Sequence, residues 1–113
     1  MEDRFQFRVW KGKENRMVYD VTYLNPLLLD PNIDPENKHN ILMQCTGLKD
    51  KNGKLIYEGD IVKMNNYILQ IVYNKDYACF CAENKNLIGY FRELRNINAF
   101  KVIGNIYENP DLI

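Results

Sequence analysis

The chain has 113 residues, of which 46% are hydrophobic and 27% are charged, and its 15 Lys and Arg balance its 15 Asp and Glu. This length predicts a single domain over residues 1–113, and the composition excludes a disordered or collagen-like chain. The zero net charge disfavours a dedicated DNA-binding protein, because a phosphate backbone attracts proteins with an excess of cations.

Cysteine usage and the N-terminus indicate the cellular compartment. Three cysteines in a short chain are an odd and sparse set, which does not predict a disulfide scaffold. The first residues lack a basic segment followed by an apolar stretch, so we expect no signal peptide. Apolar runs are far shorter than the ~20 residues that cross a bilayer. We therefore expect a cytoplasmic protein with no membrane partner.

The first predicted element is a β-hairpin over residues 5–24. Apolar residues at positions 5, 7 and 9 alternate with Gln6 and Arg8, which is the period-two pattern of a half-buried strand. A polar turn at 11–15 leads into a second run, 17–24, rich in Val, Tyr and Thr. Such runs around a glycine-containing turn predict a hairpin.

A proline-rich segment follows at residues 25–40. Pro26, Pro31 and Pro35 each remove an amide donor, so a central strand is not expected here. We predict a long exposed loop, in which Leu27–Leu29 docks as a short strand or plug.

From residue 41 onward, short extended runs alternate with tight turns. The clearest turn is 50–53, where Asp50 opens a type I turn and Gly53 supplies the left-handed position. A helical turn is predicted at 91–96, and a capped terminal turn has Pro110 at its first helical position. The predicted strands are 41–46, 54–57, 60–64, 67–73, 77–82, 87–90 and 99–106.

This rhythm predicts a mainly β protein, a β-rich α+β protein at most. Hairpin linkage through short turns favours a small antiparallel, partly open SH3-like barrel at 41–113, with the N-terminal hairpin as an extension. No helix is long enough for a βαβ crossover.

Four segments carry a resemblance to a known family. They read FRVW at 7–10, MQCTGL at 43–48 followed by DKNG, IYEGDIV at 56–62, and VIGNIYENPDL at 102–112. In this order they resemble the YopX family of phage and prophage proteins. The resemblance implies a small cytoplasmic protein of a bacterial host cell with a β-rich fold. It implies no activity and no cofactor.

Possible catalytic and metal-binding patterns are few. Glu58 and Asp60 flank a glycine, and a metal-dependent hydrolase using both is one alternative. The other interpretation is a turn whose carboxylates accept backbone amides. Cys79 and Cys81 share one strand face, and a zinc site would need Cys45 and His39 as further ligands. Buried free cysteines are the commoner outcome, and we predict no catalytic residue, metal or cofactor.

We therefore expect a non-enzymatic accessory protein that self-associates and binds a phage or host macromolecule through aromatic residues and strand edges. The candidate binding residues are Trp10, Tyr57, Glu58, Asp60, Asn105, Tyr107 and Asn109. The alternative is a regulator that binds single-stranded nucleic acid by base stacking and a small basic rim. The candidate rim residues are Lys49, Lys51, Lys54 and Lys63.

Overall fold

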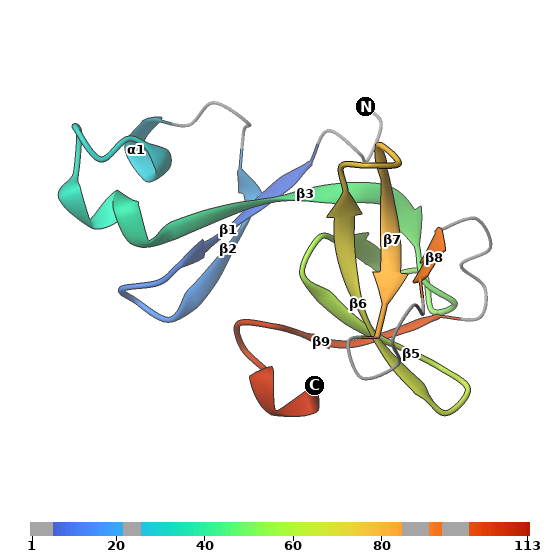
Figure 1. Cartoon of the computed structure of the whole chain (residues 1–113). Coiled ribbons are helices and arrows are strands. Elements are labelled where there is room, and N and C mark those ends of the chain that lie inside the picture. The colour runs from blue at the N-terminus through green and yellow to red at the C-terminus, as the bar shows by residue number, and fades with distance from the viewer. Residues whose placement is uncertain (1–5, 22–25, 85–90, 94–99) are drawn as a thin grey trace.

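The computed structural model describes residues 6–21, 26–84, 91–93 and 100–113, which form two antiparallel sheets (Figure 1). The mainly β class predicted from the sequence is confirmed. The strands of the described ranges are β1 (Phe7–Lys11), β2 (Arg16–Val21), β3 (Asn40–Lys49), β4 (Leu55–Tyr57), β5 (Asp60–Met64), β6 (Tyr67–Asn74), β7 (Cys79–Glu83), β8 (Phe91–Glu93) and β9 (Lys101–Asn105). The helical elements are α1 (Pro26–Leu29) and the 3-10 turns η2 (Pro35–His39) and η4 (Pro110–Leu112).

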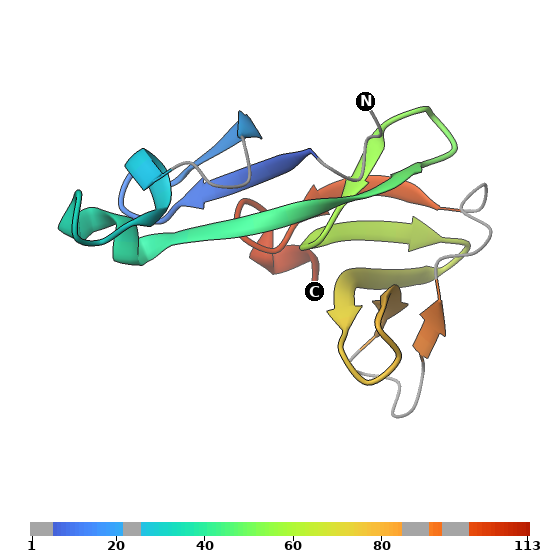
Figure 2. The ribbon, with the colours of Figure 1, turned by 90° about the horizontal axis from the view of Figure 1, so that it is seen from above.

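The first sheet has the strand order β2-β1-β3-β4. The predicted hairpin forms from β1 and β2, which pair antiparallel with a register shift between Phe7 and Val9. The long strand β3 pairs with β1 from Asn40 to Gln44 and with β4 from Cys45 onward. Figure 2 shows β3 running from the hairpin to the second sheet. One strand thus ties the N-terminal extension to the rest of the molecule.

The second sheet has the order β8-β7-β6-β5-β9, with every neighbouring pair antiparallel. Asn65, with φ of 53°, turns the chain between β5 and β6, as its tolerance of the left-handed region predicts. The register shifts between Ile61 and Val62 where β5 meets β9, and such irregularities increase twist. The sheet curls and stays open, as the turned view shows (Figure 2), which gives the partly open barrel predicted from the sequence.

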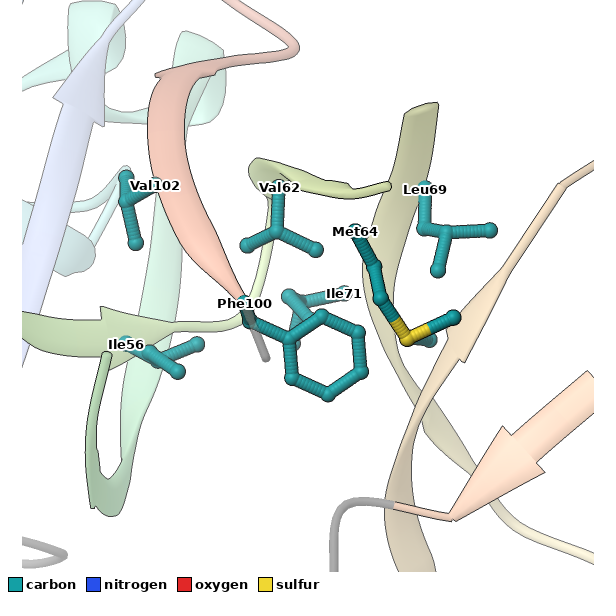
Figure 3. Packing of buried hydrophobic residues seen from close by; sticks show 8 residues of the cluster. Ile56, Val62, Met64, Leu69, Ile71, Phe100 and Val102 are labelled. Atoms are coloured by element: carbon teal, nitrogen blue, oxygen red, sulfur yellow. The ribbon is translucent and has the colours of Figure 1, made fainter. Parts of the chain in front are cut away.

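The hydrophobic core lies between β4 and the curled sheet. Phe100 packs among aliphatic side chains that come from five strands. Figure 3 shows this packing from close by. Burying each large apolar side chain stabilises the fold by about 1.5–3 kcal/mol. The cluster consists of Ile56, Val62, Met64, Leu69, Ile71, Ala82, Phe100 and Val102.

The proline-rich segment is better ordered than the sequence suggests. Residues 27–29, predicted to dock as a short strand or plug, belong to the single helical turn α1, and Pro35 starts η2. Proline fits there because the first helical turn has no partner for its amide in any case. The Asn37 side chain donates to the carbonyls of Leu27 (3.2 Å) and Asp30 (2.8 Å). The prediction of a loop is therefore wrong for 35–39, and that of a short strand is wrong for 27–29.

Two smaller expectations differ from the structure or fall outside it. Phe91–Glu93 is the strand β8, paired with β7, and so the helical turn predicted at 91–96 is not formed there. Residues 94–96, and the strand predicted at 87–90, lie outside the described residues. Of the helices in the described ranges, none has the length and apolar character of a membrane span.

Candidate binding surface

A buried ion pair joins the two sheets. Arg8 on β1 places Nη1 2.9 Å from Oδ1 of Asp60 on β5, and both side chains are almost fully buried. Arg8 Nη2 also donates to the carbonyl of Glu58 at 3.0 Å, and Asp60 Oδ2 accepts the amide of Tyr57 at 2.7 Å. Arg8, predicted on the polar side of a half-buried strand, is only 2% exposed because the second sheet covers that side.

Burial dominates the electrostatics around this pair. Burial raises the pKa of Asp60 above its ordinary value, and the Arg8 guanidinium partly opposes the shift. The same burial raises the pKa of Tyr57 to about 12, again against the charge of Arg8. The guanidinium carbon of Arg8 lies 4.8 Å from the Tyr57 ring centroid, within cation–π range. Glu58 and Asp60, the two carboxylates considered as an acid/base pair, therefore lie in different surroundings, because the Asp60 carboxylate holds Arg8 in an ion pair.

Gly59, in the motif at 56–62, occupies a position that is crowded and has a positive φ. Its φ is +88°, and a Cβ there would lie 3.0 Å from Met43 Sδ and 3.8 Å from Tyr107 Cε2. Gly59 donates its amide to Ile71 and accepts the amide of Ile106, so it connects β6 with the segment after β9. Glycine is required because a side chain would be both strained and crowded at this position.

The C-terminal motif folds into a turn held by side-chain amides. Asn105 Oδ1 accepts the amides of Tyr107 (3.0 Å) and Glu108 (2.9 Å), and its Nδ2 donates to Glu108 Oε1 (2.9 Å). Asn109 Oδ1 accepts the Asn105 amide at 3.1 Å instead of capping η4. Tyr107 then stacks on Trp10, with ring centroids 5.5 Å apart. These residues seal the end of β9 against the hairpin.

The candidate binding residues separate into two groups by burial. Trp10, Tyr57, Asp60 and Asn105 are each at most 9% exposed, so they cannot contact a partner in this conformation. Glu58, Tyr107 and Asn109 are half-buried or partly exposed. Conversely, Arg8 and the exposed apolar residues of β3 were not singled out from the sequence. A signal for Arg8 was available, since it is the one charged residue of the motif at 7–10, whereas the motif at 56–62 carries two carboxylates.

The four candidate rim lysines are all exposed. The turn that carries Lys51 is held to β9, because the Lys51 amide donates to the Phe100 carbonyl at 3.0 Å and Asp50 Oδ2 accepts the Val102 amide at 2.9 Å. Lys63 on β5 pairs with Lys101 on β9, a lysine that sequence reasoning did not select. The main chain thus brings the turn at 50–54 next to a pair of cross-strand lysines.

The cysteines divide between two places. Cys79 and Cys81 on β7 place their sulfur atoms 3.6 Å apart, whereas Cys45 is fully buried on β3. His39 lies at the end of η2, with Nε2 3.9 Å from Glu36 Oε2. Across the described ranges, no three His, Cys, Asp or Glu side chains are close enough to hold a metal ion.

The hollows of the described surface include one beside η4 and one between β3 and β6. The larger, about 480 Å³, lies between the β5–β6 hairpin, the end of β7 and η4. The smaller, about 250 Å³, lies between β3 and β6, and we call it the β3–β6 groove. The groove is lined by Ile41, Leu42, Met43, Glu58, Gly59, Gln70, Ile71, Val72, Tyr73, Ile106 and Tyr107. Most of these lining residues have apolar or aromatic side chains, and the half-buried Glu58 is the only acidic or basic residue among the described ones.

The fold and its interlocking motifs define a family of small β-rich proteins. The family model described as YopX protein matches residues 6–113, so this chain belongs to the YopX family. Among solved structures, it is similar to protein EF1440 from Enterococcus faecalis, with 29% identity, a TM-score of 0.65 and coverage of 95% of this chain and 96% of that one. It is also similar to YopX from Bacillus subtilis, with 21% identity, a TM-score of 0.58 and coverage of 95% and 94%. The comparison with curated proteins found no match.

Proposed function

We propose that this protein is a non-enzymatic accessory protein of phage or prophage that acts in the host cytoplasm. It self-associates and binds a macromolecular partner through the β3–β6 groove. The observation that supports this proposal is a group of exposed apolar side chains around one hollow. Ile41, Leu42 and Tyr73 line the groove, yet they are 40%, 36% and 49% exposed. Adjacent exposed apolar residues of this kind are typical of interaction sites.

The rest of the chemistry supports binding over catalysis. The Asp60 carboxylate is 2% exposed and is held by Arg8 and by a backbone amide, so a substrate does not reach it in this conformation. The sulfur atoms of Cys79 and Cys81 contact each other, and the single histidine is remote from them in sequence and pairs with Glu36. A nucleophile with an adjacent base is therefore not assembled by these residues.

Self-association and groove binding are tested by size and by charge substitution. We would measure the molar mass of the purified protein by light scattering over a range of concentrations. Tyr73→Asp places a charge in the groove and should reduce both self-association and partner capture from infected-cell extract. Tyr77→Asp is the matched control, since Tyr77 is 65% exposed but does not line the groove. A strict monomer that captures nothing would refute the proposal.

A second candidate function is the binding of single-stranded nucleic acid. The observation that favours it is the alignment of the turn at 50–54 with the cross-strand pair of Lys63 and Lys101. Cations that neutralise phosphates give a salt-dependent affinity, with a slope of about −0.7 for each phosphate of a single strand. The double substitution of Lys51 and Lys54 by Ala should weaken a mobility shift at low salt. Absence of any shift at low salt would exclude this function.

A further inference from the structure

Strand pairing among the described residues leaves the main chain of β3 without a neighbouring strand at Leu42 on the side away from β1. The Cys45 amide donates to the Gln6 carbonyl on the β1 side at 2.9 Å, and the pairing with β1 continues without a shift to Asn40. Since antiparallel residues alternate in direction, the amide and carbonyl of Leu42 turn away from β1. The Glu58 amide donates to the Gln44 carbonyl on that same far side. Leu42 therefore presents both main-chain groups on the side where Glu58 and Gly59 line the groove.

The opposite wall of the groove is built in the same way. The Ile71 carbonyl accepts the Gly59 amide, while β6 pairs with β7 in continuous register from Gln70 to Asn74. By the same alternation, Tyr73 turns its amide and carbonyl away from β7. The pairing of β6 with β5 ends at Gln70, so β5 does not extend as far as Tyr73. Each wall of the groove thus offers a short length of strand edge.

We propose that the β3–β6 groove takes an extended polypeptide segment of a partner protein, which adds to β3 as a strand at Leu42. This inference rests on the proposed binding function and names the kind of partner. An unpaired strand edge accepts another chain by main-chain hydrogen bonds, and side-chain pockets beside it select the sequence. A small molecule would need to supply a matching donor and acceptor at strand spacing, which a peptide backbone provides at every second residue.

The charges of the groove select the chemistry of that segment. Arg8 is neutralised by Asp60 beneath the groove, so the carboxylate of Glu58 is left as the net charge of the lining. Within the described ranges, that carboxylate has no ion-pair partner. Most of the other lining residues have apolar or aromatic side chains. The groove therefore fits a segment with apolar residues and a lysine or arginine, and it disfavours an acidic one.

The test uses two synthetic peptides and the natural fluorescence of the protein. Trp10 is the single tryptophan, and it stacks on Tyr107, which lines the groove. We would titrate the full chain with acetylated, amidated octapeptides of alternating valine and lysine, or of alternating valine and glutamate. The lysine peptide should change the fluorescence of Trp10 in a saturable way, and the glutamate peptide should bind at least about tenfold more weakly.

Main-chain recognition is tested by a substitution that removes a main-chain donor, with a control for the change of side chain. Leu42→Pro deletes an amide that β1 does not use, and proline is tolerated where an amide faces outward. It should weaken lysine-peptide binding about fivefold, as expected for the loss of one main-chain hydrogen bond. Leu42→Ala is the matched control, because it shortens the side chain but keeps the amide. Slower hydrogen exchange of the Leu42 amide in the wild-type complex provides a readout that needs no variant.

Each outcome decides the proposal. Weaker binding by Leu42→Pro than by Leu42→Ala, and loss of the lysine preference in Glu58→Gln, would support strand addition. Equal binding by both Leu42 variants, an unprotected Leu42 amide, or no saturable binding of either peptide would overturn it. If Leu42→Pro instead abolished self-association while neither peptide bound, the occupant would be a second copy. If self-association and partner capture survived in Leu42→Pro, the proposed function would stand without this edge.

Discussion

Asp60→Asn is the substitution that tests the architecture most directly. It keeps the size of the side chain but removes the charge that holds Arg8 at 2.9 Å. Asp60 accepts two donors, from Arg8 and from the Tyr57 amide at 2.7 Å, and an asparagine offers only one acceptor oxygen. The variant therefore leaves a guanidinium buried without its counter-charge.

Breaking a buried ion pair by removing one partner destabilises a protein by about 3–5 kcal/mol. Domains of this size have free energies of unfolding of about 5–15 kcal/mol, so the loss is a large fraction of the total. Urea unfolding at pH 7, monitored by circular dichroism, should show the midpoint lowered by roughly 2 M, for a slope of about 2 kcal/mol/M.

Glu14→Gln is the matched control. It removes the same charge from an ion pair of equal length, Lys11 to Glu14 at 2.9 Å, but on the surface. Its urea midpoint should stay at the wild-type value, since solvent screens exposed pairs. A loss below about 1 kcal/mol for Asp60→Asn would refute the reasoning, because the pair would then not be a buried link between the sheets.

Three further predictions follow from single residues. Gly59→Ala should lower the urea midpoint more than Gly53→Ala does. Both glycines have a positive φ, which costs about 1–2 kcal/mol once a side chain is present. Of the two, only the Cβ added at 59 would meet neighbouring atoms within 4 Å. Asp50→Asn should cost about 1–3 kcal/mol at neutral pH. Burial alone would raise the pKa of Asp50, but the hydrogen bonds from three backbone amides outweigh burial and lower that pKa. The difference in free energy of unfolding between the wild type and Asp50→Asn should therefore shrink as the pH falls from the ordinary aspartate pKa through the lowered pKa of the folded state. Because burial raises the pKa of Tyr57 to about 12, this side chain should ionise at a higher pH than an ordinary tyrosine, as followed by absorbance at alkaline pH. The free energy of unfolding of the wild type should fall as the pH rises from 10.0, the ordinary tyrosine pKa, to about 12, and Tyr57→Phe should lack this loss.

Local features of the chain were predictable because their causes are local. The turn at 50–53 forms as expected, with Gly53 at a φ of +82° and Asp50 Oδ1 accepting the amides of Asn52 and Lys54. The apolar–polar alternation placed most strands within one or two residues of their bounds. Positive φ and strand periodicity depend on a few adjacent residues, so they can be inferred without knowing the fold.

The candidate site was only partly predictable. The motif residues were recognised as a set, but the sequence does not say which of them reach the surface. Trp10, an expected anchor, is 9% exposed and stacks on Tyr107. The exposed Leu42 lies in a strand whose pattern suggested nothing unusual. Burial depends on which sheet covers which face, and this is a long-range property that alternation alone cannot specify.

By itself, the sequence determined the strand-and-turn character of this protein and its family motifs, because glycine, asparagine, proline and period-two patterns act over a few residues. Only the tertiary structure decided that Arg8 is buried against Asp60, that proline-rich residues form helical turns, and that Leu42 presents an unused strand edge. The ion pair of 2.9 Å joins residues some 50 positions apart, and the helical turns are held by Asn37 across 7 and 10 positions. The edge at Leu42 remains because β3 pairs with β4 only from Cys45 onward. Packing of one sheet on the other sets the surface that remains for a partner.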